Sequence, residues 1–136
     1  MEDVMEQKAK ELLEKCETVS LSSVDENGYP RIRIMSKLKT DRFDKLYFST
    51  LTDSKKVGHF LANPKAGVCF FSGGDSVTLT GNVEVSQDIE LKKKLWQDEF
   101  IDYFTDGVSD PNYCILTFTA KEALACIDNQ CETLQF

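Results

Sequence analysis

Strict alternation between apolar and polar residues constrains the fold of this chain more than any other sequence feature. From Val77 to Val85 every second residue is Val, Leu or Gly, and the residues between them are Thr, Asn or Glu. The segment from Pro30 to Lys39 shows the same period of two. This is the period of a β-strand, whose successive side chains point to opposite faces. The sequence therefore predicts long, half-buried strands.

Further strands are predicted where β-branched and aromatic residues gather between turn signals. They cover residues 18–24, 46–50 and 67–71, and two or three more follow residue 113. Asp25-Glu26-Asn27-Gly28 is a turn signal that ends the first. A second turn near residues 41–44 favours a hairpin between the strand that begins at Pro30 and residues 46–50. Six to eight strands with few helices predict a mainly β fold, an antiparallel barrel, because closure removes exposed sheet edges.

A few short helices complete the prediction. Residues 5–16 carry apolar side chains at helical spacing, which is typical of an amphipathic helix. Ser54 is a good N-cap for a helix over residues 55–62, and Asp88 for one that runs to Trp96. With no linker or repeat along 136 residues, we expect a single domain over residues 1–136.

Composition excludes several classes of function. A formal net charge of −7 disfavours a general nucleic-acid binder, which needs a basic face. No apolar stretch approaches the roughly 20 residues that cross a bilayer, and the first residues lack a signal-peptide pattern. We therefore expect a cytoplasmic protein with no membrane or nucleic-acid partner.

The cysteines do not form a metal-binding pattern. There are five of them and one histidine, His59, and no two cysteines have the spacing of a zinc site. We expect no bound metal, and we expect most of the cysteines to act as small apolar residues in a reducing compartment. A redox role for Cys126 and Cys131 is left open.

The segment from Phe48 to Lys56 is the best candidate for an anion site. A strand brings Ser49 and Thr50 to the sheet edge, and a turn leads into a helix that begins with Ser54, Lys55 and Lys56. Free N–H groups and the helix dipole favour a negative charge there, and a hydroxyl with two ammonium groups suits a phosphate monoester. The alternative is that Ser54 only caps the helix and the lysines are solvated.

Basic residues on the strand from Pro30 support the first interpretation. If this strand pairs with residues 46–50, its charges lie near the same phosphate. The residues concerned are Arg31, Arg33, Lys37 and Lys39. For Arg31 and Lys39, a solvated strand face is the favoured interpretation.

At these residues the chain resembles the pyridoxamine 5′-phosphate oxidase-like superfamily, and most closely its short general stress protein branch. The resemblance runs from the N-terminal helix to about Phe118 and rests on the order and spacing of several pieces. These are residues 25–30, the Arg-rich strand that ends in Met35, residues 48–56, residues 61–68 and residues 77–84. It implies a split β-barrel that binds flavin mononucleotide (FMN) at the interface of a homodimer.

The resemblance also assigns roles to individual residues. Ser54, Lys55 and Lys56 would hold the FMN phosphate, with Ser49 and Thr50 beside it. Arg33, Ile34, Met35 and Ser36 would run along the flavin ring, and Lys37 would reach the ring or the phosphate. Ser76 or Thr78 would approach from the second subunit. The oxidase proper has a tyrosine where this chain has Ser49.

A second departure concerns the activity. The C-terminal arginine and histidine with which the oxidase binds its substrate are absent from residues 128–136, so oxidation of pyridoxamine phosphate is not expected. We expect an FMN-dependent oxidoreductase that acts on a small molecule, with NAD(P)H as a candidate donor and no catalytic residue assigned. The alternatives are a non-catalytic flavin-binding stress protein and a haem- or deazaflavin-binding barrel.

Two further features have open interpretations. The lone His59, one turn beyond Lys55, is expected to be a surface residue rather than a catalyst. The aromatic segment from Trp96 to Phe104 either forms a lid over the flavin or belongs to the helix core and dimer contacts.

Overall fold

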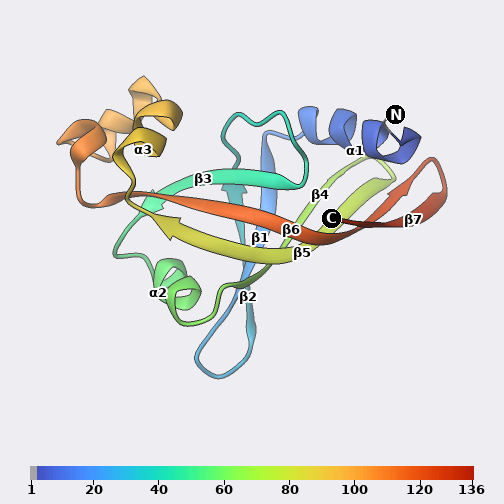
Figure 1. Cartoon of the computed structure of the whole chain (residues 1–136), viewed down its shortest axis with the longest axis horizontal. Coiled ribbons are helices and arrows are strands. Elements are labelled where there is room, and N and C mark those ends of the chain that lie inside the picture. The colour runs from blue at the N-terminus through green and yellow to red at the C-terminus, as the bar shows by residue number, and fades with distance from the viewer. Residues whose placement is uncertain (1–2) are drawn as a thin grey trace.

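One antiparallel sheet of seven strands dominates the structure, a computed structural model that describes residues 3–136 (Figure 1). Residues 1 and 2 of the expected domain lie outside the described residues. The strands are β1 (Thr18–Val24), β2 (Pro30–Ser36), β3 (Lys45–Leu51), β4 (Lys65–Ser72), β5 (Asp75–Ser86), β6 (Tyr113–Ile127) and β7 (Gln130–Gln135). Their order is β2-β1-β4-β5-β6-β3, and β7 also pairs with β6. The prediction of a mainly β fold with six to eight strands is confirmed.

The sheet coils on itself without closing, as a split barrel does. β2 and β3 lie at the two ends of the strand order. One backbone hydrogen bond, from Leu38 N–H to Tyr47 O at 2.9 Å, joins the segment after β2 to β3. β6 is long enough to serve two partners, because β3 pairs with residues 113–119 and β7 with residues 122–127.

The predicted hairpin between residues 30–39 and 46–50 is wrong. β2 pairs with β1 across the turn at residues 25–28, and β3 pairs with β6. Burial explains the choice. Leu46 and Phe48 of β3 are fully buried and lie opposite Phe118 and Leu116 of β6, which are fully buried too. Pairing β3 with the exposed edge strand β2 would bury far less apolar surface.

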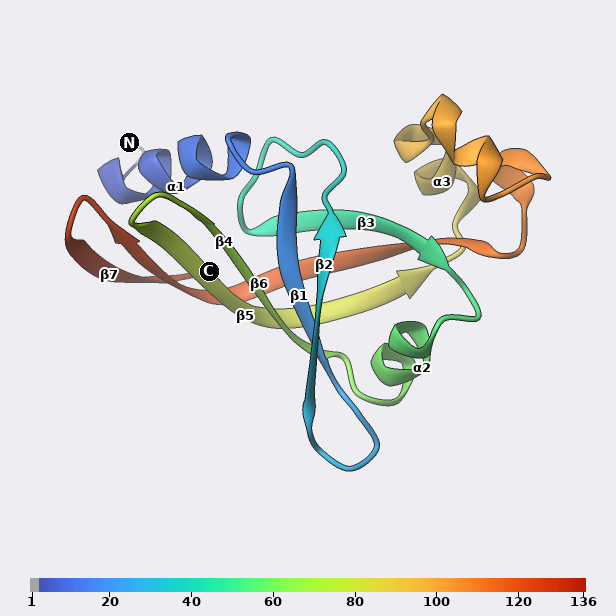
Figure 2. The ribbon, with the colours of Figure 1, turned by 180° about the vertical axis from the view of Figure 1, so that it is seen from behind.

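Three α-helices pack on the sheet, as predicted. They are α1 (Val4–Glu14), α2 (Lys55–Ala62) and α3 (Ile89–Leu95), and two short 3₁₀ helices, Asp98–Asp102 and Gly107–Ser109, follow α3. Both views place α1 at one end of the molecule and α2 with α3 at the other, where β3 and β5 end (Figures 1 and 2). Asp88 caps α3 as predicted, because its Oδ2 accepts a hydrogen bond from Leu91 N–H at 3.1 Å.

The core fills the inner face of the sheet and is sealed by α1 and α2. α1 contributes Met5, Ala9, Leu12 and Leu13, and α2 contributes Val57 and Phe60. A register shift between Thr80 and Gly81 marks a β-bulge, where β5 and β6 approach closely. A Cβ at Gly81 would collide with Thr119 O, so only glycine fits there. The two strands predicted over residues 113–119 and 124–128 are one continuous β6.

Candidate functional site

The start of α2 carries a buried hydroxyl group that has no partner. Ser54 is the N-cap of α2, as predicted, but its side chain makes no capping hydrogen bond. Within residues 3–136, its Oγ is the one buried side-chain oxygen or nitrogen without a hydrogen-bond partner. A buried polar group left unpaired costs free energy and is uncommon in folded proteins. Within the described residues, no group of the chain satisfies this hydroxyl.

Lys56 follows Ser54 by two residues, and its ammonium group contacts a neutral hydroxyl. Its Nζ donates a hydrogen bond to Thr50 Oγ1 at 3.0 Å, and the structure shows no ion pair for it within residues 3–136. Burial lowers the pKa of Lys56, and the nearby positive charge of Arg33 lowers it further. Two cations are thus held close together, which disfavours the charged state of Lys56 until an anion joins them.

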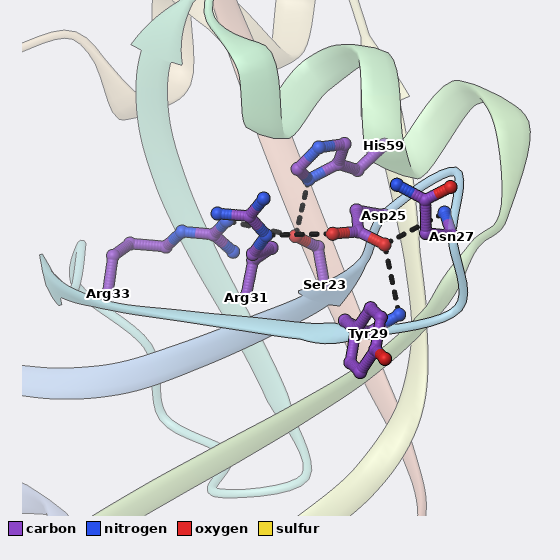
Figure 3. Close-up of polar contacts among 7 residues, drawn as sticks. All are labelled: Ser23, Asp25, Asn27, Tyr29, Arg31, Arg33 and His59. Carbon is purple, nitrogen blue, oxygen red and sulfur yellow. Dashed lines mark hydrogen bonds and ion pairs between the residues drawn. The ribbon is translucent and has the colours of Figure 1, made fainter.

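Arg33 is held in place by buried groups of β1. Its guanidinium donates to Ser23 Oγ at 2.9 Å and to Leu21 O at 3.2 Å. Ser23 is fully buried, and its Oγ also contacts His59 Nδ1 of α2 at 2.9 Å (Figure 3). Since Ser23 Oγ accepts from Arg33, its own hydrogen is free to go to His59 Nδ1. This network ties β1, β2 and α2 together around the Arg33 side chain.

Sequence reasoning missed Ser23 and took His59 for a surface residue. His59 is half-buried, and its Nδ1 contacts the fully buried Ser23 Oγ, a contact that sequence reasoning did not predict. A signal was present in the alternation of residues 18–24, which places Ser23 on the same inner face as Leu21. The position of His59, four residues after Lys55 on the same helix, was a second signal.

Arg31 does not belong to the site. Its Nε donates to Asp25 Oδ2 at 2.8 Å, and Asp25 Oδ1 accepts from the backbone N–H groups of Asn27 and Tyr29 (Figure 3). The Arg31 hydrogen bond and the one from Tyr29 N–H lower the pKa of Asp25 below its ordinary value. Arg31 therefore stabilises the β1–β2 turn, and its charge is paired with Asp25.

Lys55 and Lys56 project to different places. Lys55 is exposed and lines a cavity of about 600 Å³ together with Asp25, Arg31 and His59. Lys56 points instead toward Thr50. The structure thus brings Arg33, Thr50, Ser54 and Lys56 together, with Lys55 on the neighbouring face of the same helix turn.

The remaining predicted residues of β2 are divided between the two faces of the strand. Arg33 and Met35 lie opposite Leu21 and Val19, which are core residues of β1, and Met35 packs against the core. Ile34 is 67 % exposed on the other face, and Ser36 is also exposed. Lys37 follows the strand, and its backbone N–H donates to Glu17 O at 3.2 Å.

Ser76 and Thr78 lie far from this site within one chain. Ser76 pairs with Cys126 on β6, whereas Thr50 pairs with Cys114 on the same strand. Cys114 and Cys126 are 12 residues apart on β6, which is about 40 Å measured along a strand at ~3.3 Å per residue. Along the sheet, Ser76 and Thr78 therefore lie toward the opposite end of β6 from Thr50.

Ser49 borders a small pocket next to Thr50. The pocket has a volume of about 230 Å³, and its other lining residues are Thr50, Leu51, Phe100, Tyr103 and Phe104. Phe100 and Phe104 are buried and pack edge-to-face or tilted against Tyr113, as Trp96 does. The core interpretation therefore holds for most of the aromatic segment. Tyr103, 73 % exposed at the pocket, is the residue left to act as a lid.

The cysteines fall into two groups. Cys16 and Cys114 are free and buried and Cys69 is free and half-buried, which confirms their role as small apolar residues. Cys126 and Cys131 instead form a disulfide bond between β6 and β7, so they do not follow that expectation.

The described residues hold neither a metal-binding cluster nor a membrane-spanning helix. Residues 3–136 contain no group of three or more His, Cys, Asp or Glu side chains arranged to hold a metal ion. Among the helices of the same residues, none is long and apolar enough to span a bilayer.

Comparisons with known proteins agree with this fold. The family model described as pyridoxamine 5′-phosphate oxidase matches residues 5–126. A general stress protein 26-related protein of the pyridoxinephosphate oxidase family from Clostridium acetobutylicum has a TM-score of 0.85 at 29% identity, over 100% of this chain and 97% of that chain. General stress protein 26 from Bacillus anthracis has a TM-score of 0.81 at 25% identity, over 97% and 98%.

A more distant structure shares the fold alone. A haem-binding protein from Mycobacterium smegmatis has a TM-score of 0.79 at 10% identity, over 99% of this chain and 59% of that chain. No curated protein matches the sequence.

Proposed function

Because this chain belongs to the pyridoxamine 5′-phosphate oxidase family, we propose that it is a flavoprotein that binds FMN and acts as an FMN-dependent oxidoreductase on a small molecule. The observation that carries the proposal is the unpartnered Ser54 Oγ at the start of α2, two residues before Lys56, whose ammonium group contacts a neutral hydroxyl. These groups suit a phosphate monoester, which FMN carries at the end of its ribityl chain.

The chemistry of the donors fits a dianion. A helix start offers backbone N–H groups and the positive end of the helix dipole, and α2 begins directly after Ser54. Ser54 Oγ and Lys56 Nζ add a hydroxyl donor and a charged donor. A phosphate there would satisfy the buried hydroxyl and would restore the pKa of Lys56 by supplying the missing negative charge.

An apolar outer face supports the homodimer. Ile32, Ile34, Phe71 and Leu124 are each 47–71 % exposed. The strand register places Ile34, Thr78 and Leu124 in one row across the sheet, because Ile34 faces Ser20, Ser20 faces Cys69, Cys69 faces Thr78 and Thr78 faces Leu124. An exposed apolar patch of this kind marks an interaction surface. We propose that a second copy covers it and brings its own Ser76 and Thr78 to the flavin.

In this arrangement each group of the chain has a defined task. FMN, when bound, supplies hydride and electron transfer. Ser54 and Lys56 orient the cofactor by its phosphate, while Ser23 and Leu21 aim the Arg33 guanidinium, which stabilises negative charge on the cofactor. Tyr103 and the pocket beside Ser49 offer an aromatic surface for a flat substrate, and they exclude water from one side.

The first experiment compares FMN with riboflavin, which lacks the phosphate. The purified protein is titrated with each ligand while flavin fluorescence is followed. Replacing Lys55 and Lys56 together by Ala is expected to weaken FMN binding by about 2–4 kcal/mol through loss of charge-assisted hydrogen bonds. The same change should leave riboflavin affinity almost unaltered. Lys56→Ala alone should account for most of the loss, because Lys55 is exposed and points elsewhere.

A matched control removes the same charge elsewhere. Lys93 and Lys94 are exposed on α3, and their double replacement by Ala should leave FMN affinity unchanged. Equal FMN affinity in the Lys55/Lys56 variant and in this control, at ordinary salt, contradicts the proposed phosphate site.

A second experiment separates an enzyme from a carrier. Under anaerobic conditions, bleaching of the flavin bands by NADPH or NADH, followed by reoxidation with quinones or other electrophiles, supports the oxidoreductase. A flavin that binds but is not reduced supports the non-catalytic stress protein. Cell fractionation tests the cytoplasmic location that the proposal includes.

The same spectra address the haem alternative, which the M. smegmatis structure raises through its shared fold. Haem needs an axial ligand, and His59 is the one histidine that the sequence offers. We therefore expect flavin bands and no haem band after reconstitution with either cofactor.

A further inference from the structure

The β6–β7 hairpin presents a sulfur pair at the surface. Cys126 and Cys131 lie directly opposite each other on the two strands, with Cα atoms 4.0 Å apart, and their sulfurs are bonded. Cys131 is exposed on the edge strand β7, and Cys126 is half-buried. Attack by an outside thiolate therefore has a preferred target, because access decides which sulfur reacts.

The hairpin does not depend on this bond for its shape. Its turn residues Asp128 and Asn129 have φ values of 56° and 63°, a left-handed conformation that Asp and Asn tolerate well. Asp128 pairs with Lys8 Nζ at 2.9 Å, and its backbone N–H donates to Asp75 Oδ1 at 3.1 Å. Leu134 anchors β7 in the core. The hairpin is thus held in the dithiol form as well as in the disulfide form.

The bond also closes a short loop. Four residues separate the two cysteines, so the cross-link restricts the unfolded chain little compared with a bond between distant segments. Both redox states are therefore compatible with the same fold, as a reversible couple requires. The three free cysteines are all less exposed than Cys131, because Cys16 and Cys114 are buried and Cys69 is half-buried.

The surroundings of Cys131 are acidic. Glu132 is the next residue, and its pKa is raised by burial and by the negative charges of Asp3 and Glu6. Asp128 and Asp75 lie at the hairpin turn, where Lys8 is the cation that faces them. A negative potential of this kind repels anionic reactants and attracts cationic ones.

We propose that Cys126 and Cys131 form a reversible thiol–disulfide site that reacts with thiols of neutral or positive charge. A thiolate attacks Cys131 Sγ, the bond between the two cysteines breaks, and Cys126 leaves as a thiolate that takes up a proton. A second thiol then attacks the sulfur of the first in the mixed disulfide. Cys131 is released as a thiol, and the two outside thiols are oxidised to one disulfide. This chemistry does not rest on the proposed flavin function.

The test uses the whole protein and two small thiols of opposite charge, cysteamine and glutathione. Each is supplied at equal thiolate concentration, and the gain of two hydrogens is followed by mass spectrometry. We expect reduction by both, with cysteamine faster by about threefold or more at low salt, and a difference that shrinks near 1 M salt. The far-ultraviolet circular dichroism spectrum should not change. In Cys126→Ser, cysteamine disulfide (cystamine) should leave a mixed disulfide on Cys131.

A pair of charge variants sharpens the test. Glu132→Gln should raise the rate with glutathione, whereas Glu99→Gln, an exposed carboxylate on the 3₁₀ helix at Asp98–Asp102, should not. Resistance to both thiols, equal rates at low salt, or loss of the β-sheet spectrum on reduction overturns the proposal. Flavin binding is measured separately, so a failure here is distinct from a failure of the proposed function.

Discussion

The β1–β2 turn and the start of α2 are both polar, yet they are built in opposite ways. In the turn, Asp25 accepts hydrogen bonds from two backbone N–H groups and from Arg31, so both of its carboxylate oxygens have partners. At α2, Ser54 Oγ has no partner. Lys56 Nζ donates to the Thr50 hydroxyl and not to a carboxylate. A satisfied network stabilises a fold, whereas an unsatisfied, positively charged one is kept ready for an anion.

The largest effect that separates the two regions is expected at the turn. Asp25→Ala removes the acceptor of three hydrogen bonds from a buried position, and we expect the melting temperature of the apoprotein to fall by about 5–10 °C. Calorimetry measures the stability, and the FMN titration should give an affinity within about twofold of the wild type. A large loss of FMN affinity without loss of stability would place Asp25 in the binding site and break the comparison.

Local patterns in the sequence were enough to predict most elements of both regions. The turn at residues 25–28 and the helix at residues 55–62 follow from short-range preferences of Asn-Gly and of a serine N-cap, and the structure has both. Alternation also predicted which side chains of β5 face the core, since Val77 and Leu79 are fully buried and Thr78 is exposed.

What could not be predicted depends on long-range pairing. The sequence places β2 next to β3, but the sheet places them at opposite ends of its order. Arg33 nevertheless comes near Lys56, because the coiled sheet brings its two ends together around α2. The contact between Ser23 and His59 spans 36 residues. No local pattern specifies such contacts.

A smaller and opposite effect is expected at α2. Ser54→Ala removes a hydroxyl that no group of the chain satisfies, so the stability of the apoprotein should be unchanged or slightly higher. FMN affinity should fall about tenfold, the size of one hydrogen bond to a charged group. Ser109→Ala, which removes an exposed hydroxyl from the 3₁₀ helix Gly107–Ser109, is the control. A marked loss of stability in Ser54→Ala shows that the hydroxyl serves the fold and removes the contrast.

The smallest effect concerns pH and acts on the turn alone. The pKa of Asp25 lies below its ordinary value of 3.8, chiefly because Arg31 and the Tyr29 N–H group stabilise the carboxylate. Between the folded and unfolded pKa values the unfolded chain binds more protons, so this group's contribution is fully present well above the ordinary value of 3.8 and is lost as pH falls through the folded pKa. As pH decreases, the unfolding free energy should therefore fall more steeply in the wild type than in Asp25→Asn. The two curves should converge at low pH. Parallel curves indicate that the Arg31 pair is open in solution, and in that case the turn is less completely satisfied than the structure shows.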